Sequence, residues 1–269
     1  MTKVALITGA STGIGEAFAR RLAAAGHNLM LVARSGDKLQ ALGRQLMAQY
    51  PVKIDHLSLD LSIPDADQQL IAEVADKGLE VDLLINNAGI GSAGDFAYLP
   101  LASELRMMQL NMQTLVALTH HYLIPMRDRR QGTVINVASM ACFQPSPFMA
   151  TYAASKAFVR SFTEAVAEEN RPFNIHVMLL CPGATETSFF DNAQMKKEDR
   201  QTILGNAQLQ TPDQVVTSAL KGLEKGKRIT ISGFKNLLLI RIAYFFPNKA
   251  ITRIFANAFR PHFQQQASS

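Results

Sequence analysis

The sequence predicts an α/β protein, with a doubly wound, Rossmann-like parallel sheet in a three-layer, single-domain arrangement. Three observations favour this fold class. Strand-like and helix-like segments alternate along the chain, as they do when helices connect parallel strands. Segments such as Leu83–Ile85 and Val177–Leu180 are apolar on both faces, which strands need when helices cover both sides of a sheet. No linker rich in Pro, Gly or Ser divides the 269 residues.

Short apolar runs bounded by turn residues predict the strands. They are Val4–Thr8, Asn28–Ala33, Ile54–Leu59, Leu83–Asn86, Val134–Val137, Ile175–Leu180 and Arg228–Ser232. Apolar residues spaced three and four apart predict the helices, with Gly26 ending the first and Pro51 following the second. The helices are Glu16–Ala25, Asp37–Tyr50, Asp65–Lys77, Leu101–Arg127, Tyr152–Asn170 and Pro212–Leu223. These elements fill residues 1–232, so residues 233–269 are expected to form a C-terminal extension.

A glycine-rich segment, Thr8-Gly9-Ala10-Ser11-Thr12-Gly13-Ile14-Gly15, joins the first predicted strand to the first predicted helix. Its three glycines let the backbone turn tightly, and the N–H groups and positive dipole end of the following helix favour an anion there. The residues expected to hold a pyrophosphate are Gly9, Ser11, Thr12, Gly13, Ile14 and Gly15. Their Gly-x-x-x-Gly-x-Gly spacing differs from the Gly-x-Gly-x-x-Gly spacing of many dinucleotide sites.

Four polar residues form a candidate catalytic group. Tyr152 and Lys156 are four apart on a predicted helix, so they share one face. An ammonium beside a phenol stabilises the phenolate, and we expect Lys156 to lower the pKa of Tyr152 so that it can act as a general acid or base. Ser139 follows a predicted strand at the carboxyl edge of the sheet, where ligands bind in such folds. Asn111 lies inside a predicted helix despite its poor helix propensity.

Taken together, these motifs resemble the short-chain dehydrogenase/reductase family in its compact single-domain form. The resemblance runs from Val4 to about Ser232 and rests on the Thr8–Gly15 turn, Asn86-Asn87-Ala88-Gly89, Asn111, Ser139, Tyr152-x-x-x-Lys156 and Pro182-Gly183-x-x-x-Thr187. It implies that residues 1–232 form a dinucleotide-binding catalytic domain. It also implies an enzyme that interconverts a carbonyl and an alcohol by hydride exchange with a nicotinamide cofactor, and a homodimer or homotetramer.

The resemblance also implies positions for the remaining residues. Those expected along the adenosine half of the cofactor and its path are Asp60 (at the adenine edge), Leu61, Asn87, Ala88 and Gly89. Those expected on the nicotinamide side are Pro182, Gly183, Thr185 and Thr187. Lys156 is expected to reach the nicotinamide ribose, and Ser139 to fix the substrate oxygen against Tyr152. Asn111 is expected to hold a water that relays protons from Lys156.

The end of the second predicted strand favours NADP(H) over NAD(H). In dinucleotide folds an acidic residue there binds the ribose hydroxyls and repels a 2′-phosphate. Here Ala33 stands in that place and Arg34 follows it. A guanidinium at this position can fork onto a phosphate. The alternative is that Arg34 is only a solvated loop charge.

The positive charge of the chain lies in its C-terminal extension. Residues 1–224 contain 19 Lys/Arg and 22 Asp/Glu, a net charge of −3, whereas residues 225–269 contain 8 Lys/Arg and no Asp/Glu. Apolar residues recur at helical spacing over Ile251–Phe259, with Lys249, Arg253 and Arg260 among them. Before it, Leu237–Ile240 and Ile242–Phe246 form an apolar run broken by Arg241, which is too short and carries a charge, so it cannot span a membrane. The extension is interpreted as a pocket cap, a subunit interface or a segment that lies on an anionic membrane surface.

The expected substrate is an apolar small-molecule carbonyl or alcohol, because the variable loops Gly91–Phe96, Met140–Met149 and Ser188–Gln210 contain several aromatic residues. The residues in question are Phe143, Pro145, Pro147, Phe148, Met149, Phe189 and Phe190. Packing between loops would account for them equally well. We expect no nucleic-acid partner. We also expect no metal, since the six histidines are not spaced as metal ligands.

Two other expectations complete the sequence-based picture. The predicted strand at Val4 follows Met1 almost directly, without a leader, so we expect a cytoplasmic protein, with peripheral membrane contact as the alternative. Cys142 and Cys181 are expected to be buried free thiols. Two alternative functions stand beside the oxidoreductase: an NADP-binding regulatory or scaffold protein without turnover, and a lipid carbonyl reductase at a membrane surface.

Overall fold

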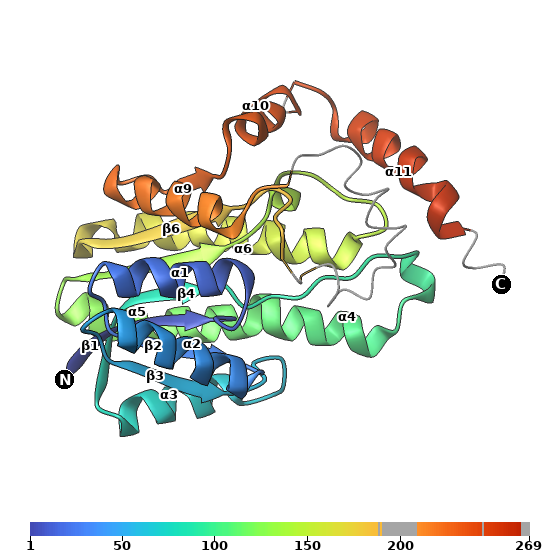
Figure 1. Ribbon diagram of the computed structural model, residues 1–269. Coiled ribbons are helices and arrows are strands. Elements are labelled where there is room, and N and C mark those ends of the chain that lie inside the picture. The colour runs from blue at the N-terminus through green and yellow to red at the C-terminus, as the bar shows by residue number, and fades with distance from the viewer. Residues whose placement is uncertain (188, 190–208, 244, 265–269) are drawn as a thin grey trace.

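A computed structural model describes residues 1–187, 189, 209–243 and 245–264 of the chain (Figure 1). Seven parallel strands form one sheet in the order β3-β2-β1-β4-β5-β6-β7. Their bounds are β1 Thr2–Thr8, β2 Leu29–Ala33, β3 Ile54–Ser58, β4 Leu79–Asn86, β5 Gly132–Val137, β6 Ile175–Cys181 and β7 Ile229–Ile231. The predicted doubly wound, single-domain α/β fold is therefore confirmed.

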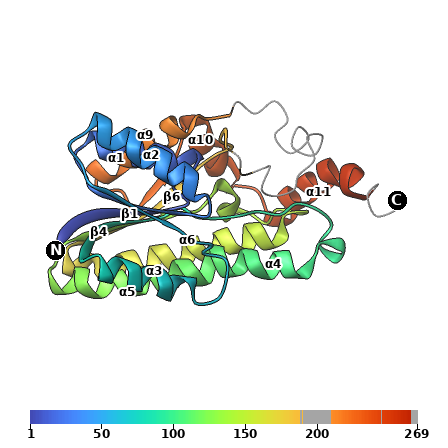
Figure 2. The same ribbon diagram turned by 60° about the horizontal axis from the view of Figure 1, so that its bottom comes forward.

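Helices cover both faces of the sheet (Figure 2). One layer contains α1 Gly13–Ala24, α2 Gly36–Gln49 and α9 Pro212–Glu224, and the other contains α3 Ala66–Asp76, α4 Leu101–Met108, α5 Leu115–Asp128 and α6 Ala150–Asn170. Each layer packs its apolar stripe against the strands, so two separate hydrophobic clusters lie on opposite faces. This two-sided burial explains why the central strands are apolar on both faces.

Local sequence signals set the start of α9. The Thr211 hydroxyl accepts a hydrogen bond from the Gln214 N–H, and the Gln214 side chain accepts one from the Thr211 N–H. This reciprocal arrangement satisfies two N–H groups that have no partner inside the helix. Pro212 is the first helical residue, where its missing N–H costs nothing.

Two elements differ most from their predicted bounds. β4 begins at Leu79, four residues before the predicted Leu83, because its first half pairs with the start of β1 although it contains Glu80 and Asp82. These charges at the amino edge of the sheet conceal the strand pattern. The predicted helix Leu101–Arg127 is interrupted by a π-helical turn, Gln109–Thr114, which contains Asn111. Such turns insert an extra residue and are frequent at functional sites.

Two helices follow the last strand: α10 Phe234–Ala243 and α11 Asn248–Gln264 (Figure 1). Both lie on the side of the molecule where the carboxyl ends of the strands point. None of the helices among the described residues is long and apolar enough to cross a membrane. The boundary at residue 232 between a catalytic domain and an extension stays a prediction.

Candidate active site

Hydrogen bonds join the first strand to the segment after β4. The Thr8 hydroxyl accepts from the N–H groups of Asn87 and Ala88, both at 3.0 Å, and donates to the Ile85 carbonyl at 3.3 Å. The Asn87 amide donates to the Thr8 carbonyl at 2.9 Å and to the Gly9 carbonyl at 3.2 Å. β1 and β4 are neighbours at the position where the strand order reverses, which is where open α/β sheets bind ligands.

The glycine turn leaves no room for side chains. Gly9 and Gly13 have φ values of 67° and 60°, in the left-handed region that favours glycine. A Cβ at Gly15 would lie 2.2 Å from the Gly9 carbonyl oxygen and 2.7 Å from the Asn87 side-chain nitrogen. The turn is therefore a cradle of backbone groups at the N-terminus of α1, and its shape fits the pyrophosphate that the sequence predicts.

A cavity of about 510 Å³ runs along the carboxyl ends of the strands. It reaches from Arg34 after β2, past the glycine turn, to Tyr152 and Phe189. The predicted residues that line it are Gly9, Ser11, Thr12, Gly13, Ile14, Arg34, Asp60, Leu61, Asn87, Ala88, Gly89, Ser139, Tyr152, Lys156, Pro182, Gly183, Thr185 and Thr187. Two predicted residues, Gly15 and Asn111, lie behind this lining, where they support the turn and the Gly89–Ile90 loop.

Asn111 fixes the loop after β4. Its amide nitrogen donates to the Ile90 carbonyl at 2.9 Å and to the Ser155 hydroxyl at 3.1 Å, and its oxygen accepts from the Ile90 N–H at 3.1 Å. A Cβ at Gly89 would lie 3.3 Å from the Asn111 oxygen and 3.4 Å from Lys156 Nζ. The π-helical turn thus places Asn111 close to Lys156, with Gly89 between them. The predicted water relay would start at this position.

Tyr152, Ser139 and Lys156 come together at one end of the cavity. Ser139 follows β5, and its side chain acts on Tyr152 so as to lower the pKa of the phenol. Lys156 Nζ donates to the Val137 carbonyl at 3.0 Å and lies 5.9 Å from the centre of the Tyr152 ring. All three predicted groups therefore share one site, and both Tyr152 and Lys156 are buried.

Burial dominates the ionisation of this pair. It raises the pKa of Tyr152 to about 12, against a lowering contribution from the Ser139 hydrogen bond, and it lowers the pKa of Lys156 to about 8. The expectation that Lys156 lowers the pKa of Tyr152 is wrong for the protein without a ligand. Both groups leave water, and the lost solvation favours the neutral phenol and the neutral amine.

Asp60 has protein partners of its own. Its carboxylate accepts hydrogen bonds from the Ser62 N–H at 3.0 Å and the Ser62 hydroxyl at 2.5 Å, and it forms an ion pair with Arg106 of α4. Burial acts to raise the pKa of Asp60, but the Ser62 bonds and the Arg106 charge outweigh it and leave the pKa lowered. Sequence reasoning missed Arg106, because nothing in its spacing relates it to Asp60.

Two cations lie at the adenosine end of the cavity. Arg34 and Lys38 are exposed and line it together with Ser35. Neither forms an ion pair with another residue of the described part of the chain. Sequence reasoning named Arg34 and missed Lys38. The signal was available, since Lys38 lies in the first turn of α2, four residues after Arg34.

The substrate end of the cavity is lined by Met140, Met149 and Phe189. Phe189 packs 5.2 Å from Tyr152 between ring centres. The expectation that the other loop aromatics line the pocket is wrong for two of them: Phe143 packs against the Arg160 guanidinium, and Phe148 stacks on Phe263 of α11. The predicted Ser188 and Phe190, with residues 191–208, lie outside the described residues.

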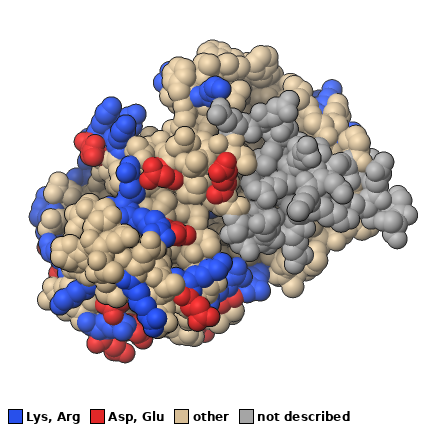
Figure 3. Space-filling view, viewed as in Figure 1, with Lys and Arg blue, Asp and Glu red and all other residues tan. Residues whose placement is uncertain are grey.

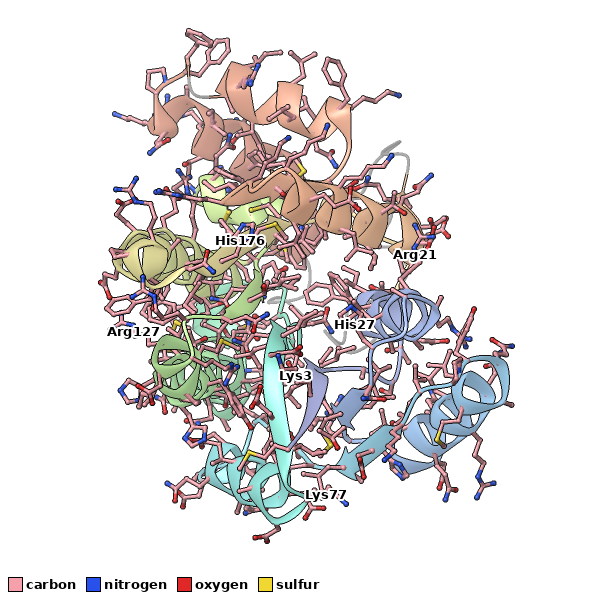
Figure 4. All side chains as sticks on the ribbon, turned by 90° about the vertical axis from the view of Figure 1, so that its left-hand side faces the viewer. Lys3, Arg21, His27, Lys77, Arg127 and His176 are labelled. Atoms are coloured by element: carbon pink, nitrogen blue, oxygen red, sulfur yellow. The ribbon has the colours of Figure 1, made fainter. Side chains whose placement is uncertain are left out.

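The remaining reactive side chains are not part of the cavity lining. Cys142 and Cys181 are buried free thiols, as predicted, with their sulfurs 3.7 Å apart. Figure 4 shows the opposite edge of the sheet, where Lys3 and His176 lie near the starts of β1 and β6. Within the described ranges, no cluster of three or more His, Cys, Asp or Glu could hold a metal ion.

Gly15→Ala is expected to weaken NADPH binding at least about tenfold, since the new methyl group collides with the Gly9 carbonyl and shifts the turn. Titration of NADPH fluorescence measures the dissociation constant. Gly43→Ala is the matched control, because a Cβ there would make an ordinary 3.5 Å contact with Ile54. Equal NADPH affinities of the two variants would contradict a pyrophosphate-binding role of the glycine turn.

Lys156→Met is expected to make the free energy of unfolding less dependent on pH. Since burial lowers the pKa of Lys156 from 10.5 to about 8, its charge destabilises the fold fully below pH 8. Between the two pKa values the unfolded chain holds a proton that the folded chain lacks, so wild-type stability rises with pH. The advantage of Lys156→Met should shrink by about 2 kcal/mol between about pH 7 and pH 9.5.

Chemical unfolding at the two pH values measures this change. Lys53→Met, at an exposed lysine, is the control and should follow the wild type at both. A constant difference between wild type and Lys156→Met across the range would show that the ammonium carries no burial penalty.

Comparisons with known proteins agree with this geometry. A 7beta-hydroxysteroid dehydrogenase of Mediterraneibacter gnavus is 32% identical over 231 residues, which cover 86% of each chain. A very-long-chain 3-oxoacyl-CoA reductase of Phaeosphaeria nodorum is 36% identical over 178 residues, which cover 64% of this chain and 52% of the longer relative. The structure of a short-chain dehydrogenase from Sphingobium yanoikuyae in complex with NADPH superposes with a TM-score of 0.79 at 30% identity, covering 87% of this chain and 88% of that one.

The family itself is identified by the match of a sequence model. The model of the short chain dehydrogenase family matches residues 3–198, which include the glycine turn, Ser139, Tyr152 and Lys156. The match covers most of the chain and the whole of the sheet as far as β6. Together with the parallel sheet, it shows that the chain belongs to the short-chain dehydrogenase family.

Proposed function

We propose that this chain is an NADP(H)-dependent oxidoreductase that interconverts a carbonyl and a secondary alcohol on an apolar substrate, with Tyr152 as the general acid and base. The observation that carries the proposal is the placement of Tyr152, Ser139 and Lys156 at one end of a cavity whose other end holds Arg34 and Lys38. A dinucleotide spans such a site with its nicotinamide near Tyr152 and its adenosine near Arg34.

The bound cofactor supplies or accepts the hydride. The residues that would hold it are the backbone of the glycine turn at the pyrophosphate, Asn87 to Gly89 along its length, and Thr185 and Thr187 on the nicotinamide side. Lys156 would meet the nicotinamide ribose. Arg34 and Lys38 would bind the 2′-phosphate, and their positive charge supports NADP(H) over NAD(H).

Carbonyl reduction requires a protonated Tyr152. With a pKa of about 12, the phenol holds its proton and can donate it to the oxygen of a substrate held by Ser139. Asn111 and Lys156 lie behind it, where a water held by Asn111 would return the proton from solvent. In the reverse direction Tyr152 would accept the proton of the alcohol, a role that needs a nearby positive charge to lower its pKa.

The apolar nature of the substrate rests on Met140, Met149 and Phe189 at the end of the cavity. The names of two relatives, a hydroxysteroid dehydrogenase and a very-long-chain oxoacyl-CoA reductase, point in the same direction. A binding protein without turnover would not need the complete set of Asn111, Ser139, Tyr152 and Lys156. We further expect a homodimer or homotetramer.

Tyr152→Phe is expected to lower kcat for ketone reduction by about 100-fold or more, since it removes the proton donor and keeps the ring. NADPH oxidation with a panel of aliphatic, aromatic, steroid and acyl-thioester carbonyls measures it. Tyr98→Phe, at an exposed tyrosine, is the control. NADPH binding should survive both changes. Turnover retained in Tyr152→Phe, or tight NADPH binding without turnover in the wild type, would refute the catalytic role.

Arg34→Ala and Lys38→Ala are each expected to raise KM for NADPH by about tenfold, which corresponds to the loss of one charge-assisted hydrogen bond. KM for NADH should stay unchanged, because NADH lacks the 2′-phosphate. Steady-state kinetics with the two cofactors in parallel measure the ratio. Arg44→Ala, an exposed arginine on the same helix α2, should alter neither value. A parallel loss with both cofactors would contradict a phosphate role.

A further inference from the structure

The two C-terminal helices and the turn between them expose several large apolar side chains. Phe245 is 87% exposed, Phe234 79% and Ile254 68%, although side chains of this kind are usually withdrawn from water. We call this set the C-terminal apolar surface; it consists of Phe234, Leu238, Leu239, Ile242, Phe245, Phe246, Ile254 and Phe255. By contrast, Ile240 is the buried residue of α10, so most of that helix faces away from the protein. So many exposed apolar side chains on two consecutive helices indicate a docking site.

The charges that α10 and α11 themselves carry are positive. Lys235 and Arg241 are exposed on α10, Lys249, Arg253 and Arg260 are exposed on α11, and no acidic residue follows Glu224 in the sequence. Over α10, at the top of Figure 3, the surface shows blue and uncharged atoms without red ones. The partner of this surface must therefore bring both apolar area and negative charge.

A second copy of the chain does not meet that requirement. In a two-fold symmetric contact the same patch faces itself, so the five cations of one copy would approach the five of the other. Like charges held together in this way oppose association. An anionic lipid bilayer meets it well, because its headgroups attract lysine and arginine while phenylalanine and leucine enter the acyl boundary.

The surface is attached to the protein next to the substrate end of the cavity. At the start of α10, the Asn236 amide donates to the Ser232 carbonyl at 2.7 Å and to Gln210 at 3.2 Å, and a Cβ at Gly183 would lie 2.2 Å from it. At the end of α11, Phe263 stacks on Phe148 with ring centres 5.1 Å apart. Gly183 lines the cavity, and so does Met149, the neighbour of Phe148.

We propose that the C-terminal apolar surface docks the protein on an anionic lipid bilayer, so that the substrate end of the cavity takes its carbonyl compound from the membrane. The docking stands on the exposed residues and charges alone. The delivery of a bilayer-dissolved substrate rests in addition on the proposed function. Neither α10 nor α11 needs to cross the bilayer, since an amphipathic segment binds while lying in its surface.

Flotation of the full-length protein with vesicles tests the docking. Wild-type protein should float with phosphatidylcholine vesicles that contain phosphatidylserine, and binding should fall at least about tenfold with pure phosphatidylcholine or at high salt. The paired change Phe245→Ser with Phe246→Ser should abolish flotation. The triple change Lys235→Gln, Arg241→Gln and Lys249→Gln should reduce it at least about tenfold.

Matched controls lie on α2 and just before β3, away from α10 and α11 (Figure 1). Met47→Ser removes an exposed apolar side chain of α2, and the pair Arg44→Gln with Lys53→Gln removes two exposed cations. Both should float like the wild type. No flotation, flotation independent of phosphatidylserine, or equal loss in the controls would overturn the docking. So would a wild-type dimer that the Phe245→Ser, Phe246→Ser variant fails to form in sedimentation velocity.

Turnover separates this inference from the proposed function. With NADPH and a water-soluble ketone, the surface variants should keep wild-type kcat, because none of the changed residues lines the cavity. With a long-chain ketone dissolved in anionic vesicles, they should lose at least about tenfold in rate. Equal rates on the vesicle substrate would overturn the delivery. Flotation without any turnover would support the docking and count against the enzyme.

Discussion

The hydrogen bonds between Thr8 and the Asn87–Ala88 backbone are the constraint on which the site depends. They join the end of β1 to the end of β4, at the point where the strand order of the sheet reverses. The glycine turn can approach a ligand closely because Asn87 holds its carbonyls from behind. The same fastening sets the path of Gly89 and Ile90, and therefore the position of Asn111 against Lys156.

The cavity on either side of this point has two chemically different ends. The end at Arg34 and Lys38 is exposed and basic, so it favours negative charge on whatever binds there. The catalytic end is buried, and Tyr152 and Lys156 are both pushed toward their neutral forms. Such groups are poised to respond strongly to any charge placed beside them, because the surrounding dielectric is low. The buried pair costs stability, which is common where a site is arranged for chemistry.

Most of the fold and of the site could be predicted because the signals are local. A strand between two helix layers must be apolar throughout, and a tight turn beside a phosphate must be glycine, so β1, β6 and the Thr8–Gly15 turn are visible in the sequence. The start of β4 was not visible, since Glu80 and Asp82 interrupt its apolar pattern at the amino-terminal edge of the sheet. The π-helical turn at Asn111 depends on bonds to Ile90 and Ser155, which are distant in sequence.

The errors in the site have a related origin. Whether an aromatic residue in a loop faces a pocket depends on what else it can pack against. Phe143 packs against Arg160, and Phe148 packs against Phe263. The ion pair between Asp60 and Arg106 joins segments 46 residues apart, without a pattern that links them. The pKa of Tyr152 depends on the depth of its burial, and a four-residue spacing carries no information on depth.

The attachment of α10 and α11 has a consequence for how such a chain can change over generations. The pair follows β7 and lies outside residues 3–198, to which the family model applies. The exposed side chains of α10 and α11 can therefore vary without disturbing a strand or the glycine turn, whereas Asn236 and Phe263 are constrained by their contacts with Gln210 and Phe148. An exposed position on these helices and a position in the cavity can change independently of each other over generations.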